Sequence, residues 1–289
     1  MKKDAMQVFE HLLPSGPHDS PWIYDDKLGP RYQADLALLE TLLALPLRTG
    51  SSSESGQLAK GIDTWLAHEL RRAGFPEDEV YPRQTQPRVL PREVGLLLQQ
   101  LPKDLREEVS MRLKRSGTVA PGSGRILGRV YFKQVDVFMA QWARGPEILV
   151  STKSMVSSFR NNLPNRFEES YGDAKNLRGR HPLAAMGFFF LLRSTILTDE
   201  GAFSKAVDML RKLRSEADVY DATCLVIAEW DDTSTTNVTV LPDAVPADLH
   251  PNIFLSTIVD KVLERTPVDV HVIVRERRDQ THTGLKEEQ

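Results

Sequence analysis

The sequence predicts an α/β fold in which helices pack on a central mixed sheet. The first part of the chain carries helical patterns, and a middle segment is rich in Val, Ile, Phe and Tyr, which are common in strands. Helical patterns then alternate with short apolar runs towards the C-terminal end. This order of elements favours an α/β sandwich, with the N-terminal helices as an elaboration on that core.

Composition limits the classes of function that need to be considered. The chain has 289 residues, of which 40% are hydrophobic and 27% are charged, so it can bury the core of one large domain or of two small ones. Its formal net charge is −3. A basic footprint over the whole chain is therefore absent, and any binding of nucleic acid must use a local basic surface.

Cysteine usage and hydropathy favour the cytoplasm. Cys224 is the single cysteine, which excludes an intramolecular disulfide, and its apolar flanks predict a buried thiol. The sequence shows no pattern of a secretory signal peptide, so we expect a cytoplasmic protein. The longest apolar stretch, Pro182–Leu192, is too short to span a bilayer, and no association with membranes is expected.

The N-terminal segment, residues 1–56, is predicted to be a helical arm. It contains a candidate short helix near Met6–Leu13 and a leucine-rich helix over Tyr32–Leu47. A Ser/Gly-rich connector, Thr49–Gly56, then leads into residues 57–289, which we expect to form the α/β domain.

The helix predicted over Gln57–Ala73 is the clearest element in the sequence. Ile62, Trp65 and Leu66 belong to an apolar stripe at helical spacing, and Gly74 supplies the stop signal at the C-terminal end. We expect this helix to pack against the sheet.

The remaining elements are predicted from the spacing of apolar residues and from turn residues. A helical insertion at about 92–115 is broken near Pro102. Predicted strands are Glu79–Arg83, one or two strands within Ile126–Ala140, then Glu147–Lys153, Thr223–Glu229 and Val268–Val274. Further helices are predicted after Asn165, near Pro182–Ile196, over Ala202–Ala217 and over Asn252–Arg265.

An acidic residue in one predicted strand and a lysine in the next form the most informative pattern. Asp136 lies in the apolar run Val135–Phe138, and Lys153 lies at the polar end of the strand Glu147–Lys153. Side chains alternate across a strand, so Ser151 and Lys153 share a face. If the two strands form a hairpin, Asp136 lies near Lys153.

These residue types suit the hydrolysis of phosphodiesters. A carboxylate can hold Mg²⁺, which polarises a phosphate and lowers the pKa of water. A lysine can position that water and stabilise developing charge. The alternative interpretation makes Asp136 and Lys153 solvated strand residues or a structural ion pair.

This segment resembles the PD-(D/E)XK restriction-endonuclease superfamily, whose signature is an Asp on one strand and (D/E)-X-K on the next. The resemblance assigns catalytic roles to Asp136 and Lys153 and implies a restriction-endonuclease-like α/β sandwich with Mg²⁺ or Mn²⁺ as the cofactor. Ser151 stands where the family has its second acid, so one metal-binding carboxylate is missing from the motif.

The resemblance suggests where the missing carboxylate comes from, because members of the family often carry an acid on the helix before the sheet. Asp63 is the first candidate and Glu69 the second, and the backbone carbonyl of Thr152 is a further implied metal ligand. Glu147 lies six residues before Lys153, roughly 20 Å along an extended strand, so we exclude it as a ligand of the same ion.

A run of basic residues follows the predicted catalytic lysine and is interleaved with Asn and Tyr, a combination that suits contacts with phosphates and bases. The candidate DNA-binding residues are Arg160, Arg166, Lys175, Arg178 and Arg180.

The sequence therefore predicts a metal-dependent DNA endonuclease of a restriction or DNA-defence type that acts on double-stranded DNA. Ser151 keeps open the alternative of an inactive DNA-binding module on the same fold. The helical N-terminal part keeps open an interaction subunit of a defence complex. Cutting both strands with one site per chain would favour a homodimer.

Overall fold

The structure is a computed structural model, and it describes residues 4–14, 16, 18–48, 56–115, 119–231 and 237–280. The predicted connector Thr49–Gly56 lies outside the described residues except for Gly56. Residues 116–118, between the predicted helical insertion and the predicted strands of Ile126–Ala140, also lie outside the described residues.

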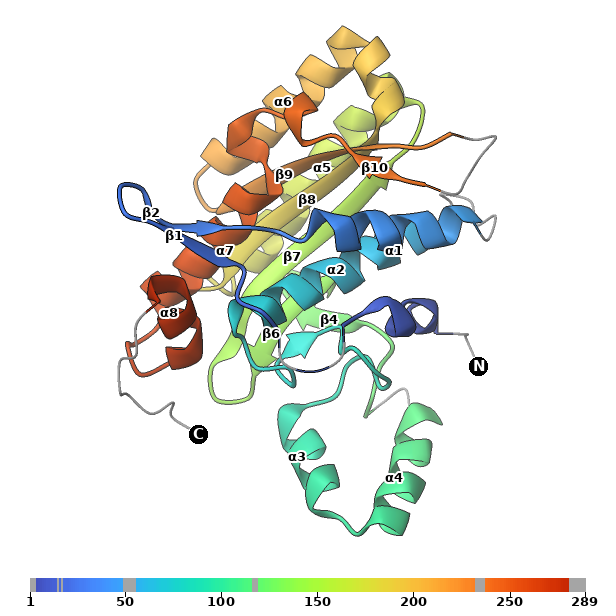
Figure 1. Ribbon diagram of the computed structural model, residues 1–289, viewed down its shortest axis with the longest axis vertical. Coiled ribbons are helices and arrows are strands. Elements are labelled where there is room, and N and C mark those ends of the chain that lie inside the picture. Colours follow the sequence, from blue (N-terminus) through green and yellow to red (C-terminus); the bar gives the residue numbers. More distant parts are fainter. Residues whose placement is uncertain are drawn as a thin grey trace.

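A six-stranded mixed sheet forms the centre of the molecule (Figure 1). Its central strands β7, β8 and β9 run parallel, whereas β6, β3 and β10 are each antiparallel to the strand beside them. In spatial order the strands are β10 (Thr239–Val240), β9 (Ala222–Glu229), β8 (Ala185–Arg193), β7 (Gly145–Met155), β6 (Val137–Gln141) and β3 (Val80–Tyr81).

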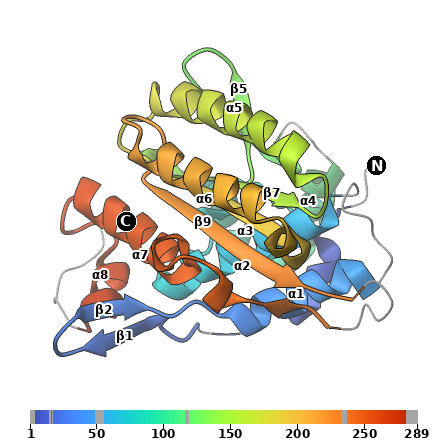
Figure 2. The same cartoon turned by 90° about the horizontal axis from the view of Figure 1, so that it is seen from above.

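Helices cover both faces of the sheet, which confirms the predicted α/β class and the mixed sheet. Figure 2 shows α5 (Phe159–Arg178) and α6 (Glu200–Ser215) on one face, and α1 (Leu36–Arg48), α2 (Gln57–Ala73) and α7 (Pro251–Arg265) on the other. Two hydrophobic clusters result, one on each face, because successive side chains of a strand point to opposite sides.

The helix α2 has the bounds that the sequence predicts. Trp65 and Leu66 are buried against the sheet, and the Trp65 ring packs at 5.7 Å from that of Phe189 on β8. Gly74 ends the helix with φ 109°, a left-handed conformation that glycine adopts without strain.

The two motif strands form a hairpin. β6 pairs antiparallel with β7 from Val137↔Val150 to Gln141↔Gly145. The region predicted as one or two strands holds three, because β4 (Gly124–Leu127) and β5 (Phe132–Val135) form a separate two-stranded sheet ahead of β6.

The predicted helix near Pro182–Ile196 is wrong, because residues 185–193 form the central strand β8. A short apolar run does not distinguish a buried helix from a strand that is buried on both faces. Residues 185–193 have a parallel strand on each side, so they form a strand that is buried on both faces. Gly187 within β8 lies against Phe254 of α7, where an added Cβ would come within 2.6 Å of the ring.

The predicted final strand Val268–Val274 is also wrong. Its second half begins the helix α8 (Val272–Asp279), in which Val272 and Val274 are buried. Arg275 donates hydrogen bonds to the carbonyls of Leu263 and Thr266, which holds α8 against the end of α7. Tertiary contacts therefore override the strand preference of the valines.

The N-terminal segment packs onto the rest of the molecule. Phe9 from the short helix η1 (Gln7–Leu12) and Leu42 from α1 belong to the same hydrophobic cluster as α2 and the sheet. A hairpin of β1 (Trp22–Asp25) and β2 (Gly29–Tyr32) lies between them in sequence.

The helical insertion is present as α3 (Arg92–Gln100) and α4 (Lys103–Arg115), and the two helices project away from the sheet in Figure 1. The remaining short helices are η3 (Ser194–Thr198), η4 (Pro242–Ala244) and η5 (Ala247–Leu249). Within the described residues, no helix combines the length and apolar character needed to cross a bilayer.

Candidate functional site

Asp63 of α2 and Thr152 of β7 meet where the helix crosses the sheet. The Thr152 hydroxyl donates a hydrogen bond of 2.6 Å to Asp63 Oδ1, and the Lys60 ammonium lies 2.6 Å from Oδ2 of the same carboxylate. Asp63 is only 1% exposed. The sequence therefore places a fully buried acid on α2 with one charged partner a helical turn away.

Asp136 reaches the same strand residue from the other side. It lies at the junction of β5 and β6, one residue before the pair Val137↔Val150, and Asp136 Oδ2 accepts a 3.0 Å hydrogen bond from the backbone N–H of Thr152. Within the described residues, no strand pairs with β7 beyond Val150 on this side. The carboxylate therefore binds to an otherwise open strand edge.

The two acids share a buried, electrostatically strained environment. Burial, and after it the nearby charge of Asp63, raise the pKa of Asp136 to about 6, against the lowering effects of the Thr152 N–H, Lys60 and Lys153. Burial opposes the charge of Lys60, but Asp63 outweighs it, so the pKa of Lys60 is raised. Paired carboxylates of this kind favour a cation between them.

Asp63 and Asp136 are the side chains here that a magnesium-like ion would need as ligands. Mg²⁺ is usually held by one or two carboxylates together with substrate phosphates, and Asp63 and Asp136 supply two. In a strand, the N–H and C=O of one residue point to the same edge, so the Thr152 carbonyl faces the side on which Asp136 lies. In the described part of the chain no group of three or more Asp, Glu, His or Cys side chains could hold a metal.

Ser151 and Lys153 lie on the opposite face of β7, towards α5. Lys153 Nζ pairs with Glu169 Oε1 of α5 at 2.9 Å, and Arg166 Nη1 holds the second oxygen of that carboxylate at 2.7 Å. Burial opposes the charge of Glu169, but the lysine and the arginine outweigh it and lower its pKa. The hydroxyl of the buried Tyr220 donates a 3.1 Å hydrogen bond to the Ser170 carbonyl of α5.

Sequence reasoning missed Glu169 as a site residue. The i, i+3 spacing of Arg166 and Glu169 predicts their ion pair, but it does not predict the contact with Lys153. That contact depends on how α5 folds back over β7, which no local pattern encodes.

Two other acids are engaged elsewhere. Glu69, the second candidate on α2, is bound by Arg72 and by the backbone N–H of Asp35, away from Thr152. Glu147, which the sequence analysis excludes as a metal ligand, is held by Arg144 at 2.9 Å and by His271 at 3.0 Å. Both have structural roles.

The predicted DNA-binding residues do not form one set. Arg178 is 7% exposed and is occupied by Asp221 and by the Ala184 carbonyl, so its role is structural and it cannot face DNA.

The other four basic residues are nearer the surface. Arg160 pairs with Asp199, Arg166 with Glu169, and Lys175 donates to the Ala217 carbonyl. Arg180 is exposed and has no acidic partner among the residues that are described.

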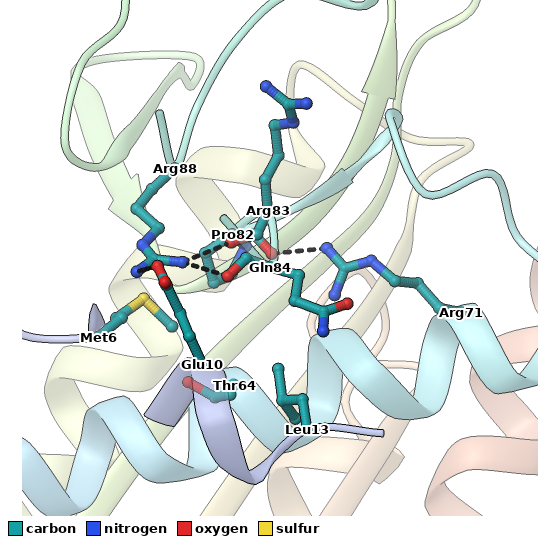
Figure 3. A pocket seen from close by; sticks show the side chains of 9 residues that line it. All are labelled: Met6, Glu10, Leu13, Thr64, Arg71, Pro82, Arg83, Gln84 and Arg88. Carbon is teal, nitrogen blue, oxygen red and sulfur yellow. Dashed lines mark hydrogen bonds and ion pairs between the residues drawn. The ribbon is translucent and has the colours of Figure 1, made fainter. Parts of the chain in front are cut away.

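Two hollows lie away from Thr152. The first, shown in Figure 3, has a volume of about 10 Å³, which is room for about one water molecule. Arg88 and Arg71 in its wall are bound to Glu10 and to backbone carbonyls. The second, of about 410 Å³, has in its lining Arg178 and Arg265, which both pair with Asp221. Neither offers the paired acids that the motif requires.

No family model matches this chain, and neither a curated protein nor a solved structure matches it. The site must therefore be interpreted from its own geometry.

Proposed function

We propose that the chain is a metal-dependent endonuclease of double-stranded DNA with a variant PD-(D/E)XK site on a restriction-endonuclease-like α/β sandwich. The observation that carries the proposal is the meeting of Asp63 and Asp136 at Thr152. A buried acid and a half-buried acid from different elements meet here beside lysines, and their mutual repulsion opposes the stability of the fold.

Asp63, Asp136 and the Thr152 carbonyl would hold Mg²⁺ or Mn²⁺, which polarises a phosphate and activates water when it is bound. Lys153 would orient the attacking water and stabilise charge on the phosphate oxygens. Glu169 has a positioning role: its carboxylate holds the lysine ammonium 2.9 Å away, on the side of β7 that α5 covers.

The alternatives differ from the leading function in a measurable way. A DNA-binding module without cleavage is favoured by Ser151, which brings no charge to the motif. An interaction subunit is favoured by the exposed apolar residues Leu97 of α3 and Met111 of α4. Cleavage of DNA separates both from the leading proposal.

The test is a plasmid-cleavage assay with Mg²⁺ or Mn²⁺, on unmodified and on modified DNA. We expect Asp136→Ala and Lys153→Ala to abolish cleavage and to retain binding of a DNA duplex in Ca²⁺. The surface variants Asp208→Ala and Lys212→Ala, which remove an exposed ion pair on α6, serve as controls. Full cleavage by Lys153→Ala refutes the assignment, and binding without cleavage by the wild type supports the inactive module.

Glu169 and Glu168 give a sharper comparison, because they are neighbouring acids on one helix. Glu169→Gln should lower kcat by weakening the hold on Lys153, whereas Glu168→Gln, which changes an exposed side chain, should leave it unchanged. A shift of the pH profile in the first variant alone supports the positioning role. Equal activity of the two variants contradicts it.

A further inference from the structure

The hairpin of β4 and β5, residues 124–135, is a basic element in an otherwise slightly acidic chain. It contains Arg125, Arg129 and Lys133 and no acidic residue, whereas the whole chain has a formal net charge of −3. We refer to it as the basic hairpin. Figure 2 shows its strand β5 beside α5.

The strand register sorts the hairpin into two faces. Arg125 is paired with Gln134, and the next pair on the same side is Leu127 with Phe132. Arg125, Phe132 and Gln134 are exposed, and the Arg125 guanidinium lies 5.6 Å from the centre of the Phe132 ring. A guanidinium, an aromatic ring and an amide therefore share one solvent face, which is the combination that contacts phosphates and bases.

The opposite face is fixed to the body of the molecule. Val135 is buried, and Lys133 pairs with Asp173 of α5. Gly124 packs on the ring of Phe138, where an added Cβ would come within 2.0 Å. The exposed face is thus presented by a supported element and not by a free loop.

The tip of the hairpin is held by Asn176 near the end of α5. The Asn176 side chain accepts a hydrogen bond from the Val130 N–H at 2.8 Å and donates one to the Tyr131 carbonyl at 3.0 Å. The backbone carbonyl of Asn176 accepts a third from the Arg129 N–H at 2.7 Å. His181 hydrogen-bonds to the Leu127 carbonyl at 2.9 Å. These bonds hold the tip while leaving Val130 80% exposed.

The tip also brings Arg129 close to Arg180, which follows the end of α5. An added Cβ on Gly179 would lie 3.1 Å from Cδ of Arg129, so the Arg129 side chain crosses the helix end directly before Arg180. Arg125, Arg129 and Arg180 are exposed, and none has an acidic partner in the part of the chain that the structure describes. They are free to meet a polyanion.

The basic hairpin directly precedes Asp136 in the chain, and its Lys133 lies beside Glu169. β5 ends at Val135, directly before Asp136. Lys133 lies 3.9 Å from Glu169, the same carboxylate that holds Lys153. The hairpin therefore lies on the same side of β7 as Lys153 and Glu169.

We propose that the basic hairpin is a duplex-contacting arm: Arg125, Arg129 and Arg180 hold DNA phosphates, and Phe132 and Val130 lie against bases in a groove. The inference rests on the proposed function and extends it to how DNA is held. The major groove of B-DNA admits a two-stranded ribbon, and the uncompensated arginines favour a polyanion over a protein surface of mixed charge.

The experiment measures binding of a fluorescently labelled DNA duplex in Ca²⁺ by anisotropy over a series of salt concentrations. Arg129→Ala and Arg180→Ala should each weaken binding and lower the slope of log K against log salt by about one. Phe132→Ala should weaken binding at least about fivefold with little change in slope, because it removes contacts with bases and no charge.

The matched control is Arg31→Ala on the β1–β2 hairpin, which also carries exposed apolar residues. It should bind as the wild type does. Melting temperatures establish that each variant is folded. If Phe132→Ala is not folded, binding by Arg129→Gln is measured in its place.

Unchanged affinity and slope in the hairpin variants, with a wild type that binds or cleaves DNA, overturns this inference and leaves the proposed function intact. A wild type that neither binds nor cleaves duplex DNA overturns both. Equal losses in the hairpin variants and in Arg31→Ala would show a diffuse charge effect and would also overturn the arm.

Discussion

The charge of Asp136 depends on its protein surroundings. Burial and the neighbouring Asp63 raise its pKa from the reference 3.8 to about 6, so the native state binds more protons than the unfolded chain between these values. Stability contributed by this carboxyl is therefore present at low pH and is lost as pH rises through that window.

Asp136→Asn should remove this pH dependence. The amide oxygen can still accept from the Thr152 N–H, but it carries no charge. We expect the variant to be more stable than the wild type above about pH 6, by on the order of 1–3 kcal/mol, and equal to it below about pH 4. Urea unfolding of both proteins across this pH range is the measurement, and two parallel stability curves would contradict the expectation.

Lys60 acts as the internal counter-charge of Asp63 in the absence of a metal. Lys60→Met should lower the melting temperature in EDTA, since it leaves the buried Asp63 without that neutralising partner. A divalent cation that binds the native state restores stability by mass action, so Mn²⁺ should raise the melting temperature of this variant more than that of the wild type.

The control for Lys60 is Lys261→Met, which removes the lysine of an i, i+3 pair with Glu264 on the surface of α7. It should respond to Mn²⁺ as the wild type does. A Lys60→Met protein that Mn²⁺ does not stabilise would show that Asp63 and Asp136 are not a cation site.

At the scale of elements, α2 is both the support of the site and the best-packed helix on its face of the sheet. Trp65 is fully buried, donates its indole N–H to the Asp35 carbonyl at 2.7 Å and packs on Phe189. The same helix carries Asp63 two residues earlier. Packing of Trp65 therefore fixes the position of Asp63 relative to Thr152.

Trp65→Ala should lower the free energy of unfolding by about 3–5 kcal/mol, because it removes a large buried ring and leaves a cavity. Trp142→Ala is the matched control, since Trp142 in the β6–β7 turn is 90% exposed. That change should alter stability by less than about 0.5 kcal/mol. Equal effects in a denaturant titration would mean that α2 does not dock as the structure shows.

At the scale of the whole molecule, α3 and α4 are an exposed pair of helices with unburied apolar side chains. Leu96, Leu97, Leu105 and Met111 are all exposed. The sequence of α4 has five basic and three acidic residues, so charges of both signs are available to pair across a two-fold axis. A second copy of the chain suits this surface, and a dimer would bring one site to each strand of a duplex.

We therefore expect the wild type to form a dimer that Leu97→Glu and Met111→Glu convert to a monomer. Light scattering after size-exclusion chromatography measures the mass directly. Leu28→Glu at the exposed β1–β2 turn provides a control of equal charge change. A monomeric wild type at all concentrations would contradict the dimer, and cleavage by that monomer would show that one chain suffices.

The sequence by itself determined the elements whose patterns are local. The bounds of α2 and the α/β class follow from apolar spacing and turn residues. The family resemblance nominated Asp63, Asp136 and Thr152, and both acids hydrogen-bond to Thr152 in the structure. Hydrophobic period and helix-stop signals act over a few residues, so they can be interpreted without coordinates.

Only the tertiary structure decided what depends on contacts between distant segments. Residues 185–193 became a strand because parallel neighbours bury both of their faces, and Arg178 became structural because it meets Asp221 from another element. Glu169 faces Lys153 only once α5 has folded over β7. Such pairings are set by burial and packing across the sheet, which a single linear pattern does not encode.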